Sequence, residues 1–599
     1  MSQFFKQTFA SIIGSFIGLC LFLTLGASSL VFMLFAAVSP KEEPRVDNKS
    51  ILVFDLSTDV RDSQPPANLG QAISGKKRET MTLRRVLQSI EKATNDDRIV
   101  GLFLDGRRGG GGGGYANMAE VRTALEKFRA KGKKIIAYDV TLSEREYYLT
   151  SLADEVILNP MGIMELNGLS SKQMFFKGAL EKYGVGVQVV RVGDYKAAVE
   201  PYTRTNLSEE NRQQTQALLT DLWDKFLSTV GNSRDLAVAD LQKLADKEGF
   251  VDPKQAEKMG LIDRVGYYDN AVRKLQELTG ESDEKPEFRH ITLKTYAERT
   301  ISPIEAAISE NKIAIVYAEG AIVGGKGTIE TIGSDRFAEE FRELREDDSV
   351  KAIVLRVNSP GGSATASEVI LREILLTRKE KPVIVSMGNM AASGGYWIAA
   401  GASQIFAEEN TITGSIGVFG LLSNIQEIAN NHGVTWDVVK TGRFADIGSN
   451  LRPKTEEELA IYQKSVSKTY DLFLRKVAKY RNLPKNKVHE IAQGRIWSGK
   501  EAVKIGLVDR IGGLEAAIAH AAEEAKLGKD WQIEEYPQQN RFETEIVERI
   551  LNIESLESTV KLDPITSEML NIRKKLAILE SFDDPTGIYA RLPFSFEID

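Results

Sequence analysis

The feature that most constrains this chain is an internal repeat. Two stretches of about 220–250 residues each carry the same order of hydrophobic runs and glycine turns. Residues 99–105 match residues 350–356, and residues 134–138 match residues 382–386. From there a constant offset of 249 positions pairs similar residues, among them Tyr147 with Tyr396, Gly168 with Gly417, Val190 with Val439 and Gly193 with Gly442. Self-similarity over a long period indicates a repeated structural unit, so the body is predicted to be a tandem duplication.

Each repeat alternates short β-branched runs with longer stretches of helical periodicity. In the second half, four runs are predicted to be strands, at residues 312–318, 351–357, 382–386 and 404–407. Residues 335–345 and 365–377 lie between them with helical spacing of apolar residues. This alternation predicts an α/β fold with buried strands and crossover helices.

The repeat also predicts how the chain divides into domains. Residues 279–287 form a charged, proline-containing linker between the halves. We therefore expect an N-terminal segment at 1–46, a first repeat at 47–285, a second repeat at 286–535 and a C-terminal extension at 536–599. Two segments of the extension, residues 542–556 and 567–582, have helical patterns whose apolar faces predict docking on the body or on another subunit.

The N-terminal segment predicts a membrane anchor. Residues 8–38 contain no charged side chain and are dominated by Ile, Leu, Phe, Ala and Gly. About 20 apolar residues span a bilayer, whereas a cleaved signal peptide has an apolar core of about 7–15 residues. A retained transmembrane helix is therefore expected. The flanking charges, Lys6 before the segment and Lys41, Arg45 and Lys49 after it, do not by themselves favour export of the body.

Composition and failed motifs exclude several classes of function. The chain has 77 Lys and Arg against 84 Asp and Glu, whereas a nucleic-acid surface needs a basic excess. Residues 494–500 match the start of a phosphate loop, but Glu501 replaces the Ser or Thr that binds magnesium. His489 and Glu490 begin a zinc-protease motif, yet Gln493 stands where the second histidine is needed. We therefore expect no metal, no cofactor and no nucleic acid.

Two glycine-rich turns in the second half carry the strongest chemical signal. Residues 358–363 (NSPGGS) follow one predicted strand, and residues 390–397 (MAASGGYW) follow the next. Ser393 in the second turn leads into a helix, and its small neighbours let a substrate backbone approach. Backbone N–H groups of these turns are expected to form an oxyanion hole, supplied by Gly361 or Gly362 and by Gly394. The alternative interpretation is two tight turns in a packed α/β core.

A serine nucleophile needs a base, and no histidine lies in a matching turn. A lysine base is the alternative, as in Ser-Lys variants of the serine-protease scheme. At the offset of 249, Ser393 corresponds to Glu144, and Lys196 corresponds to Ala445. Each half therefore keeps a different member of a possible pair. This pattern predicts one composite site, which we expect within a single chain.

A catalytic lysine must be neutral. An ordinary lysine, with a pKa near 10.4, is charged at neutral pH and cannot accept a proton. We expect burial to lower the pKa of Lys196. The nearby carboxylate of Asp194 would oppose this effect, so its side chain is expected to point away.

Four motifs together resemble the long, tandem-repeat form of the signal peptide peptidase A family, also called protease IV. They are NSPGGS, MAASGGYWI, TGSIGVFG at residues 413–420 and RVGDYKAAVEP at residues 191–201, and the resemblance covers about residues 8–530. It implies a tandem duplication of a Clp protease/crotonase-like domain built of ββα repeats. It also implies roles for three side chains: Ser393 as nucleophile, Lys196 as general base and Ser415 as the residue that positions the lysine amine.

The resemblance further implies a homotetramer in the bacterial plasma (inner) membrane, with its body on the outer, periplasmic side. The implied substrates are remnant signal peptides and other extended apolar peptides. The chain departs from the family pattern at Gly109–Gly114, a run of six glycines, which we interpret as a flexible loop in the half without a nucleophile. Two alternatives stay open: a crotonase-like acyl-CoA enzyme, which would bind CoA without a seryl adduct, and a non-catalytic membrane scaffold.

Overall fold

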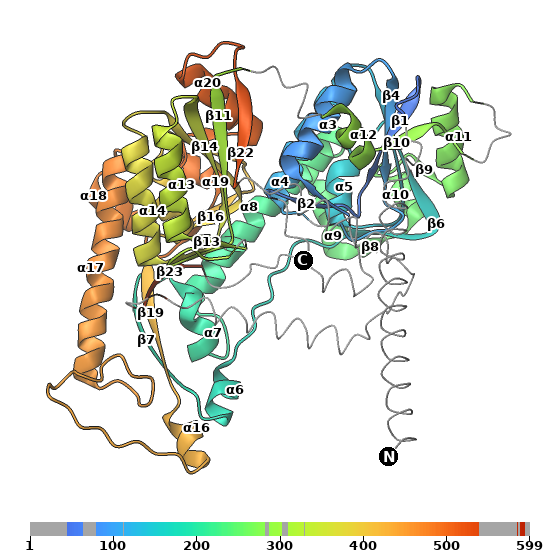
Figure 1. Cartoon of the computed structure of the whole chain (residues 1–599). Coiled ribbons are helices and arrows are strands. Elements are labelled where there is room, and N and C mark those ends of the chain that lie inside the picture. Colours follow the sequence, from blue (N-terminus) through green and yellow to red (C-terminus); the bar gives the residue numbers. More distant parts are fainter. Residues whose placement is uncertain are drawn as a thin grey trace, which may run out of the picture. The chain divides into compact units, whose positions relative to one another are not determined.

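The computed structural model describes residues 45–63, 79–111, 113–281, 287–301, 309–328, 330–537, 584 and 587–592 (Figure 1). The predicted anchor at residues 8–38 and the predicted tail helices at 542–556 and 567–582 lie outside these residues. Among the helices that are described, none combines the length and apolarity needed to cross a membrane. The labelled elements all belong to one compact unit of the chain.

The first half forms a seven-stranded sheet of order β10-β1-β4-β5-β6-β8, with β9 paired to β6. Its strands are β1 (Ser50–Asp55), β4 (Ile99–Asp105), β5 (Lys134–Leu142), β6 (Glu155–Leu166), β8 (Gly249–Val251), β9 (Arg264–Val265) and β10 (His290–Thr292). The central strands run parallel because crossover helices connect them, among them α3 (Leu83–Asn95) and α4 (Tyr115–Ala130). Helices α3 and α4 pack on one face of the sheet, and α11 (Tyr268–Thr279) covers the opposite face.

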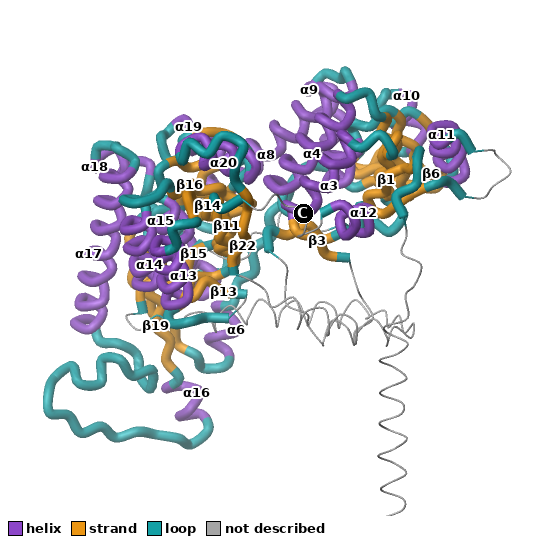
Figure 2. The backbone as a smooth tube through the Cα atoms, turned by 45° about the horizontal axis from the view of Figure 1, so that its top comes forward, coloured by secondary structure: helices purple, strands orange, loops and turns teal. Residues whose placement is uncertain are grey.

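The second half repeats this plan in a sheet of order β20-β18-β16-β14-β11-β22, with β17 paired to β16 and β21. Figure 2 shows four neighbouring strands of this sheet, β16, β14, β11 and β22. The strands of the sheet are β11 (Lys312–Glu319), β14 (Val350–Ser359), β16 (Val383–Ala392), β17 (Gln404–Ala407), β18 (Ile412–Gly414), β20 (Ile496–Ser498), β21 (Arg510–Ile511) and β22 (Gln532–Tyr536). Helices α13 (Ser334–Glu346), α14 (Ala364–Thr377), α15 (Gly394–Ala399) and α17 (Glu456–Tyr480) enclose the larger core on one face. Helix α20 (Leu514–Glu524) covers the other face.

The α/β prediction for this half is confirmed. The four predicted strands are β11, β14, β16 and β17, and the two predicted helices are α13 and α14. The main difference is at β16, which continues to Ala392, beyond the predicted end at residue 386. It continues because its last residues pair with β18, so that Ala392 lies opposite Gly414. This extension brings the chain directly to Ser393.

A third sheet joins strands from both halves. Its order is β13-β12-β15-β23-β19-β7, and its strands are β7 (Gly186–Val192), β12 (Ala321–Val323), β13 (Thr331–Gly333), β15 (Gly361–Ser363), β19 (Val418–Asn424) and β23 (Ile588–Arg591). Strand β7 of the first half pairs antiparallel with β19 of the second half, from Val192 opposite Val418 to Gly186 opposite Asn424. This pairing carries the residues that follow β7 into the second half.

A buried ionic cluster also links the halves. Arg356 on β14 lies 2.9 Å from Asp62 and 2.8 Å from Glu120, and all three side chains are almost completely buried. Its guanidinium also donates to Asn117 at 2.9 Å and to Ser386 at 2.7 Å. A buried cation is stable only when it is paired and hydrogen-bonded. The cluster therefore fixes the register of β14 against first-half side chains.

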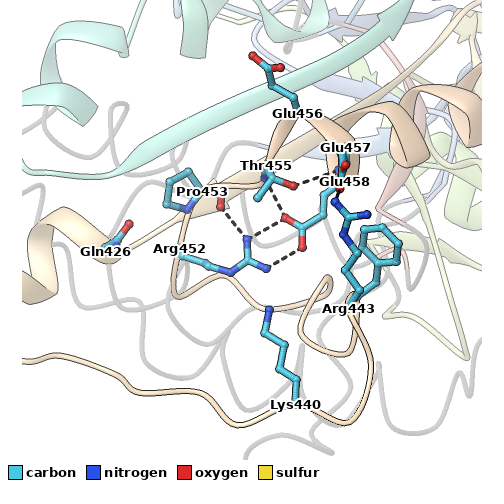
Figure 3. Close-up of a pocket in the computed structure, with 10 residues that line it drawn as sticks. Gln426, Lys440, Arg443, Arg452, Pro453, Thr455, Glu456, Glu457 and Glu458 are labelled. Carbon is cyan, nitrogen blue, oxygen red and sulfur yellow. Dashed lines mark hydrogen bonds and ion pairs between the residues drawn. The ribbon is translucent and has the colours of Figure 1, made fainter.

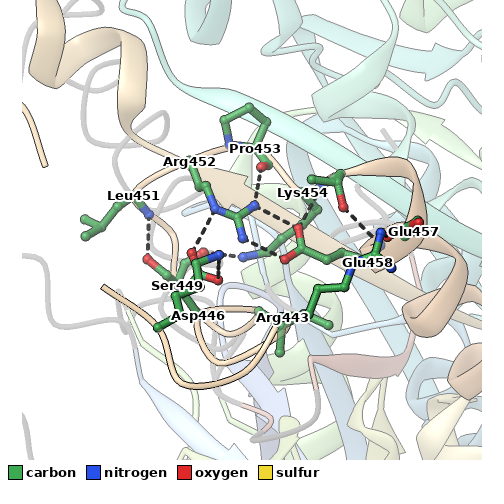
Figure 4. A network of polar contacts seen from close by, with 12 residues as sticks. Arg443, Asp446, Ser449, Leu451, Arg452, Pro453, Lys454, Glu457 and Glu458 are labelled. Atoms are coloured by element: carbon green, nitrogen blue, oxygen red, sulfur yellow. Dashed lines mark hydrogen bonds and ion pairs between the residues drawn. The ribbon is translucent and has the colours of Figure 1, made fainter. Parts of the chain in front are cut away.

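An extended arm, residues 425–455, leaves the second half between β19 and α17. Its base is fastened by Arg452, which contacts Asp446 at 3.0 Å and Glu458 at 2.6 Å (Figure 4). Arg452, Glu458 and Lys440 border a cavity of about 700 Å³ (Figure 3). Within the arm, residues 435–441 correspond to β7 at the offset of 249 but form no strand. Val439 is 98% exposed, whereas its counterpart Val190 is 5% exposed.

Candidate active site

Ser393 occupies a strained turn between β16 and α15. Its φ of 57° lies in the left-handed region, which side-chain-bearing residues seldom adopt. Two backbone hydrogen bonds hold the turn. The Ser393 N–H donates to the Gly414 carbonyl, and the Ser393 carbonyl accepts from the Trp397 N–H, both at 2.8 Å. Strain of about 1–3 kcal/mol at one residue persists only where the surroundings fix it, and it clusters at functional sites. The Ser393 hydroxyl is buried and makes no capping hydrogen bond to the helix that it precedes.

Lys196 reaches this serine from the first half. It follows β7 at the start of a short 3-10 helix, Ala197–Val199. Its backbone passes against Gly494, where an added Cβ would come within 2.7 Å of the Lys196 Cα atom. Its Nζ atom lies 2.7 Å from the Ser393 Oγ atom. Two residues separated by 197 positions therefore meet in one buried contact.

Ser415 holds the other side of the amine. Lys196 Nζ donates to the Ser415 Oγ atom at 3.0 Å and to its carbonyl oxygen at 3.1 Å. Ser415 also has a positive φ, of 50°, and its N–H donates to the Arg495 carbonyl at 2.7 Å. When the two N–H bonds of a neutral amine point at Ser415, its lone pair is free to face the Ser393 hydroxyl.

Burial controls the charge of this amine. The Lys196 side chain is completely buried, and this burial lowers its pKa well below the ordinary value. Among the described residues, no carboxylate contributes to that shift. Asp194 acts elsewhere: burial, with a smaller contribution from Asp194, raises the pKa of Tyr470. The arrangement therefore places an amine with a lowered pKa beside the Ser393 hydroxyl.

The three glycines expected to form an oxyanion hole lie close together. A Cβ built on Gly361 would come within 2.6 Å of the Gly394 nitrogen. The φ of Gly361 is 92°, a conformation that favours glycine. Its N–H donates to Ser359 Oγ at 3.1 Å, so it already has a partner. Gly362 and Gly394 are therefore the stronger candidates for donors to a developing oxyanion.

Among its described residues, the first half carries no equivalent site. Glu144 stands where the second half has Ser393, and its carboxylate accepts from the Asn167 N–H at 2.6 Å and the Gly168 N–H at 2.8 Å. In the glycine run, the Gly110 N–H donates to Glu146 at 3.2 Å, and Gly114 caps α4. Among the described residues, no cluster of His, Cys, Asp and Glu could hold a metal ion.

One neighbour of the site was missed in the sequence. Strand β23, from the C-terminal extension, lies between β15 and β19 and is buried. The alternating residues Ile588 and Ala590 resemble a strand pattern, but four residues are too few to distinguish from the adjoining chain.

Comparison with known proteins gives a consistent result. The family model "Peptidase family S49" matches residues 127–281 and 376–528, and the model "Clp protease" matches residues 308–413. A protein named Protease 4 from Haemophilus influenzae is 36% identical over 519 residues, covering 84% of each chain. Protease 4 of Salmonella typhi is 33% identical and covers 90% of each chain. The chloroplastic serine protease SPPA of Arabidopsis thaliana is 32% identical over 81% of this chain and 70% of its own.

Proposed function

Since the chain belongs to peptidase family S49 and is a serine protease, we propose that it cleaves peptides with a dyad of Ser393 and Lys196. The observation that carries this proposal is the 2.7 Å contact between the Ser393 hydroxyl and the buried Lys196 amine. The amine has a lowered pKa and comes from the other repeat, which agrees with the loss of the serine from the first half and of the lysine from the second.

The proposed mechanism follows from this geometry. Neutral Lys196 takes the proton of Ser393 while the Oγ atom attacks the peptide carbonyl carbon. Backbone N–H groups of Gly362 and Gly394 stabilise the oxyanion. Lys196 then gives the proton to the leaving amine, and water hydrolyses the acyl-enzyme. Ser415 accepts hydrogen bonds from the amine and keeps its lone pair directed at Ser393.

A serine-directed fluorophosphonate tests this proposal. It should modify Ser393 and abolish hydrolysis of a peptide ester, and Ser393→Ala should be unlabelled and inactive. Ser403→Ala, in the turn between α15 and β17, is the matched control and should react as the wild type does. Labelling of Ser393→Ala at the wild-type rate would contradict the assignment. CoA binding without a seryl adduct would instead support the acyl-CoA alternative.

The proposed substrates are signal peptide remnants and other extended apolar peptides. The resemblance to signal peptide peptidase A suggests this class. This substrate class is supported by the third sheet, where β15 and β19 lie on either side of the extended strand β23. An extended peptide that adds to strand edges is recognised chiefly through its backbone, so an unfolded apolar segment fits better than a folded protein.

We place the enzyme in the bacterial inner membrane, anchored by residues 8–38, with its body on the periplasmic side. The uncharged length of that segment supports the anchor. Fractionation tests this placement: the full chain should sediment with membranes, and a chain beginning at residue 47 should not. Protection of the body from protease added to spheroplasts would contradict the periplasmic side.

We further propose a homo-oligomer, a tetramer by the family resemblance. Within the chain, β7 of the first half pairs with β19 of the second. By the offset of 249, residues 435–441 are the counterpart of β7 and residues 169–175 are the counterpart of β19. These two stretches do not pair with each other within the chain, and both lie outside the described strands. The first stretch exposes Trp436, Val438 and Val439. Pairing of this stretch with residues 169–175 of a second copy would repeat the internal contact and generate a ring.

A further inference from the structure

The lysine of the proposed dyad lies in a loop rather than in a regular element. Strand β7 ends at Val192, and the 3-10 helix begins at Ala197. A lysine side chain has many rotamers of similar energy, so it gives little precision of its own. The Lys196 amine therefore stays at hydrogen-bond distance from Ser393 only if the backbone of residues 193–196 is fixed.

Residues 493–496 lie against this loop. Three of them begin the stretch that resembles a phosphate loop in the sequence. The Gln493 carbonyl accepts from the Tyr195 N–H at 2.9 Å. Gly494 has a φ of 79°, and an added Cβ there would come within 2.7 Å of the Lys196 Cα atom. This stretch is therefore shaped to contact the backbone of the lysine loop.

The same short segment also holds the turn that contains Ser415. The Arg495 carbonyl accepts from the Ser415 N–H at 2.7 Å, and the Gly494 N–H donates to the Ile416 carbonyl at 2.9 Å. The two partners of the lysine amine are thus fixed relative to residues 493–496. A shift of this segment against the lysine loop would move the amine away from them.

The side chain of Gln214 connects the loop to the segment. Gln214 lies on α8 (Glu209–Arg234) and is 2% exposed. Its Nε2 atom donates to the Tyr195 carbonyl at 3.0 Å, and its Oε1 atom accepts from the Ile496 N–H at 3.1 Å. The Nε2 atom also donates to Asn211 Oδ1 at 3.1 Å. Each end of the amide therefore has partners of the matching kind, which fixes its orientation.

Helix α8 is itself fastened close to Lys196. Asn211 Nδ2 donates to the Glu200 carboxylate at 2.9 Å, and the Ser208 N–H donates to the same carboxylate at 3.2 Å. Glu200 follows the 3-10 helix directly. Gln214 is thereby presented from a helix whose first turn is tied to the chain four residues after the lysine.

We propose that Gln214 is a positioning residue: its amide locks Tyr195 to Ile496 and so holds the Lys196 amine at Ser393. This inference rests on the proposed dyad. Gln214 takes no part in bond making, because both ends of its amide are bonded to protein groups. Without the amide, the lysine loop and residues 493–496 can move apart. A misplacement of about 1 Å in an active site can lower the rate about 100-fold.

Kinetics of Gln214→Met test this role, since methionine keeps the length of the side chain and removes its hydrogen bonds. We expect kcat for a peptide ester to fall by about 10- to 100-fold per folded chain. KM should stay within about twofold, because the effect is on the reacting groups rather than on substrate binding. Wild-type kcat in Gln214→Met would overturn the inference.

Gln213→Met is the matched control. Gln213 is the preceding residue of α8 and is exposed, and it accepts from the hydroxyl of Tyr195 at 3.1 Å rather than from its backbone. Its replacement should leave kcat within about twofold, as surface substitutions usually do. A loss equal to that of Gln214→Met would overturn the inference, because it would not depend on the backbone contacts.

A double-mutant cycle distinguishes positioning of the lysine from general support of the fold. The rate of phosphonylation at Ser393 is measured in wild type, Gln214→Met, Lys196→Ala and the double variant. If Gln214 acts through Lys196, Gln214→Met should slow the wild type by about 10- to 100-fold but change Lys196→Ala by less than about twofold. Equal factors in both backgrounds would indicate a merely structural role and overturn the inference.

Gln214→Asn serves if Gln214→Met does not fold. It keeps the amide but is one methylene shorter and cannot reach both backbone groups, so kcat should still fall at least about threefold. Wild-type kcat in this variant would also overturn the inference. If the Gln214 variants are fully active while Lys196→Ala is inactive, only the positioning role is wrong. If Lys196→Ala keeps the wild-type rate, the proposed dyad is contradicted, and the role of Gln214 falls with it.

Discussion

In the proposed mechanism, catalysis depends on one uncharged amine, that of Lys196. Lys196→Arg keeps a charge that cannot be shed in the accessible pH range, so it should be as inactive as Lys196→Ala. Loss of a catalytic base typically costs several powers of ten in turnover. Lys196→His should retain a trace of activity, with its pH limb moved to lower pH. Values of kcat/KM for the three variants check this, and comparable activity in Lys196→Arg would rule out lysine as the base.

The same amine should lower the stability of the fold. In the unfolded chain Lys196 titrates near 10.4, whereas burial lowers its pKa in the folded state. Between those two values the unfolded state binds more protons, so this contribution to stability falls as the pH decreases. Lys196→Met, which removes the titration and keeps the volume, should raise the free energy of unfolding at pH 7 by about 1–3 kcal/mol. Urea unfolding of the two proteins measures this difference, and a less stable Lys196→Met would contradict the buried neutral amine.

At the scale of elements, the pairing of β7 with β19 delivers the lysine to the serine. Val190→Asp places a carboxylate at a buried position of β7 and should reduce activity strongly, although Val190 makes no contact with the reacting groups. Val439→Asp changes the equivalent residue of the other half, which is exposed, and should leave peptide hydrolysis within about twofold, as surface substitutions usually do. Kinetics of the two variants provide the comparison. Equal loss of activity in both would contradict the structural role assigned to β7.

Sequence periodicity was sufficient to predict those strands and helices whose burial follows from packing within one half. Strands β11, β14, β16 and β17 and helices α13 and α14 show their patterns within single segments. The third sheet could not be predicted in this way, because its pairings join residues 186–192 with 418–424 and residues 361–363 with 588–591. The repeat predicted that Ser393 and Lys196 complement each other, but it also aligned residues 186–192 with residues 435–441 as equivalent stretches. Only the first has a partner strand within the described chain.

At the scale of the whole molecule, the two halves are joined by a buried cation as well as by strands. Arg356→Ala would leave Asp62 and Glu120 buried without their partner, and breaking such a pair costs about 3–5 kcal/mol. Arg98→Ala, which breaks the ion pair with Asp96 at the surface, should lower the free energy of unfolding by only about 0–1 kcal/mol. Denaturant midpoints measure both. Equal small losses would show that the cluster does not hold the halves together.

The oligomer is the second feature at this scale. If residues 435–441 pair with a second copy, Val439→Asp should lower the assembled mass in light scattering while each chain keeps its own dyad. Mixtures of Ser393→Ala with Lys196→Ala chains should then stay inactive, because each chain needs both residues. Recovery of activity in the mixture would show instead that the site is shared between subunits.

The most direct test of the central claim is the pH dependence of phosphonylation at Ser393, followed by mass spectrometry. With Lys196 as the base, the rate should rise along a single limb whose midpoint lies well below the ordinary lysine pKa. In Lys196→Ala the limb should disappear and the rate should fall by about two or more powers of ten. An unchanged limb in Lys196→Ala would contradict the dyad.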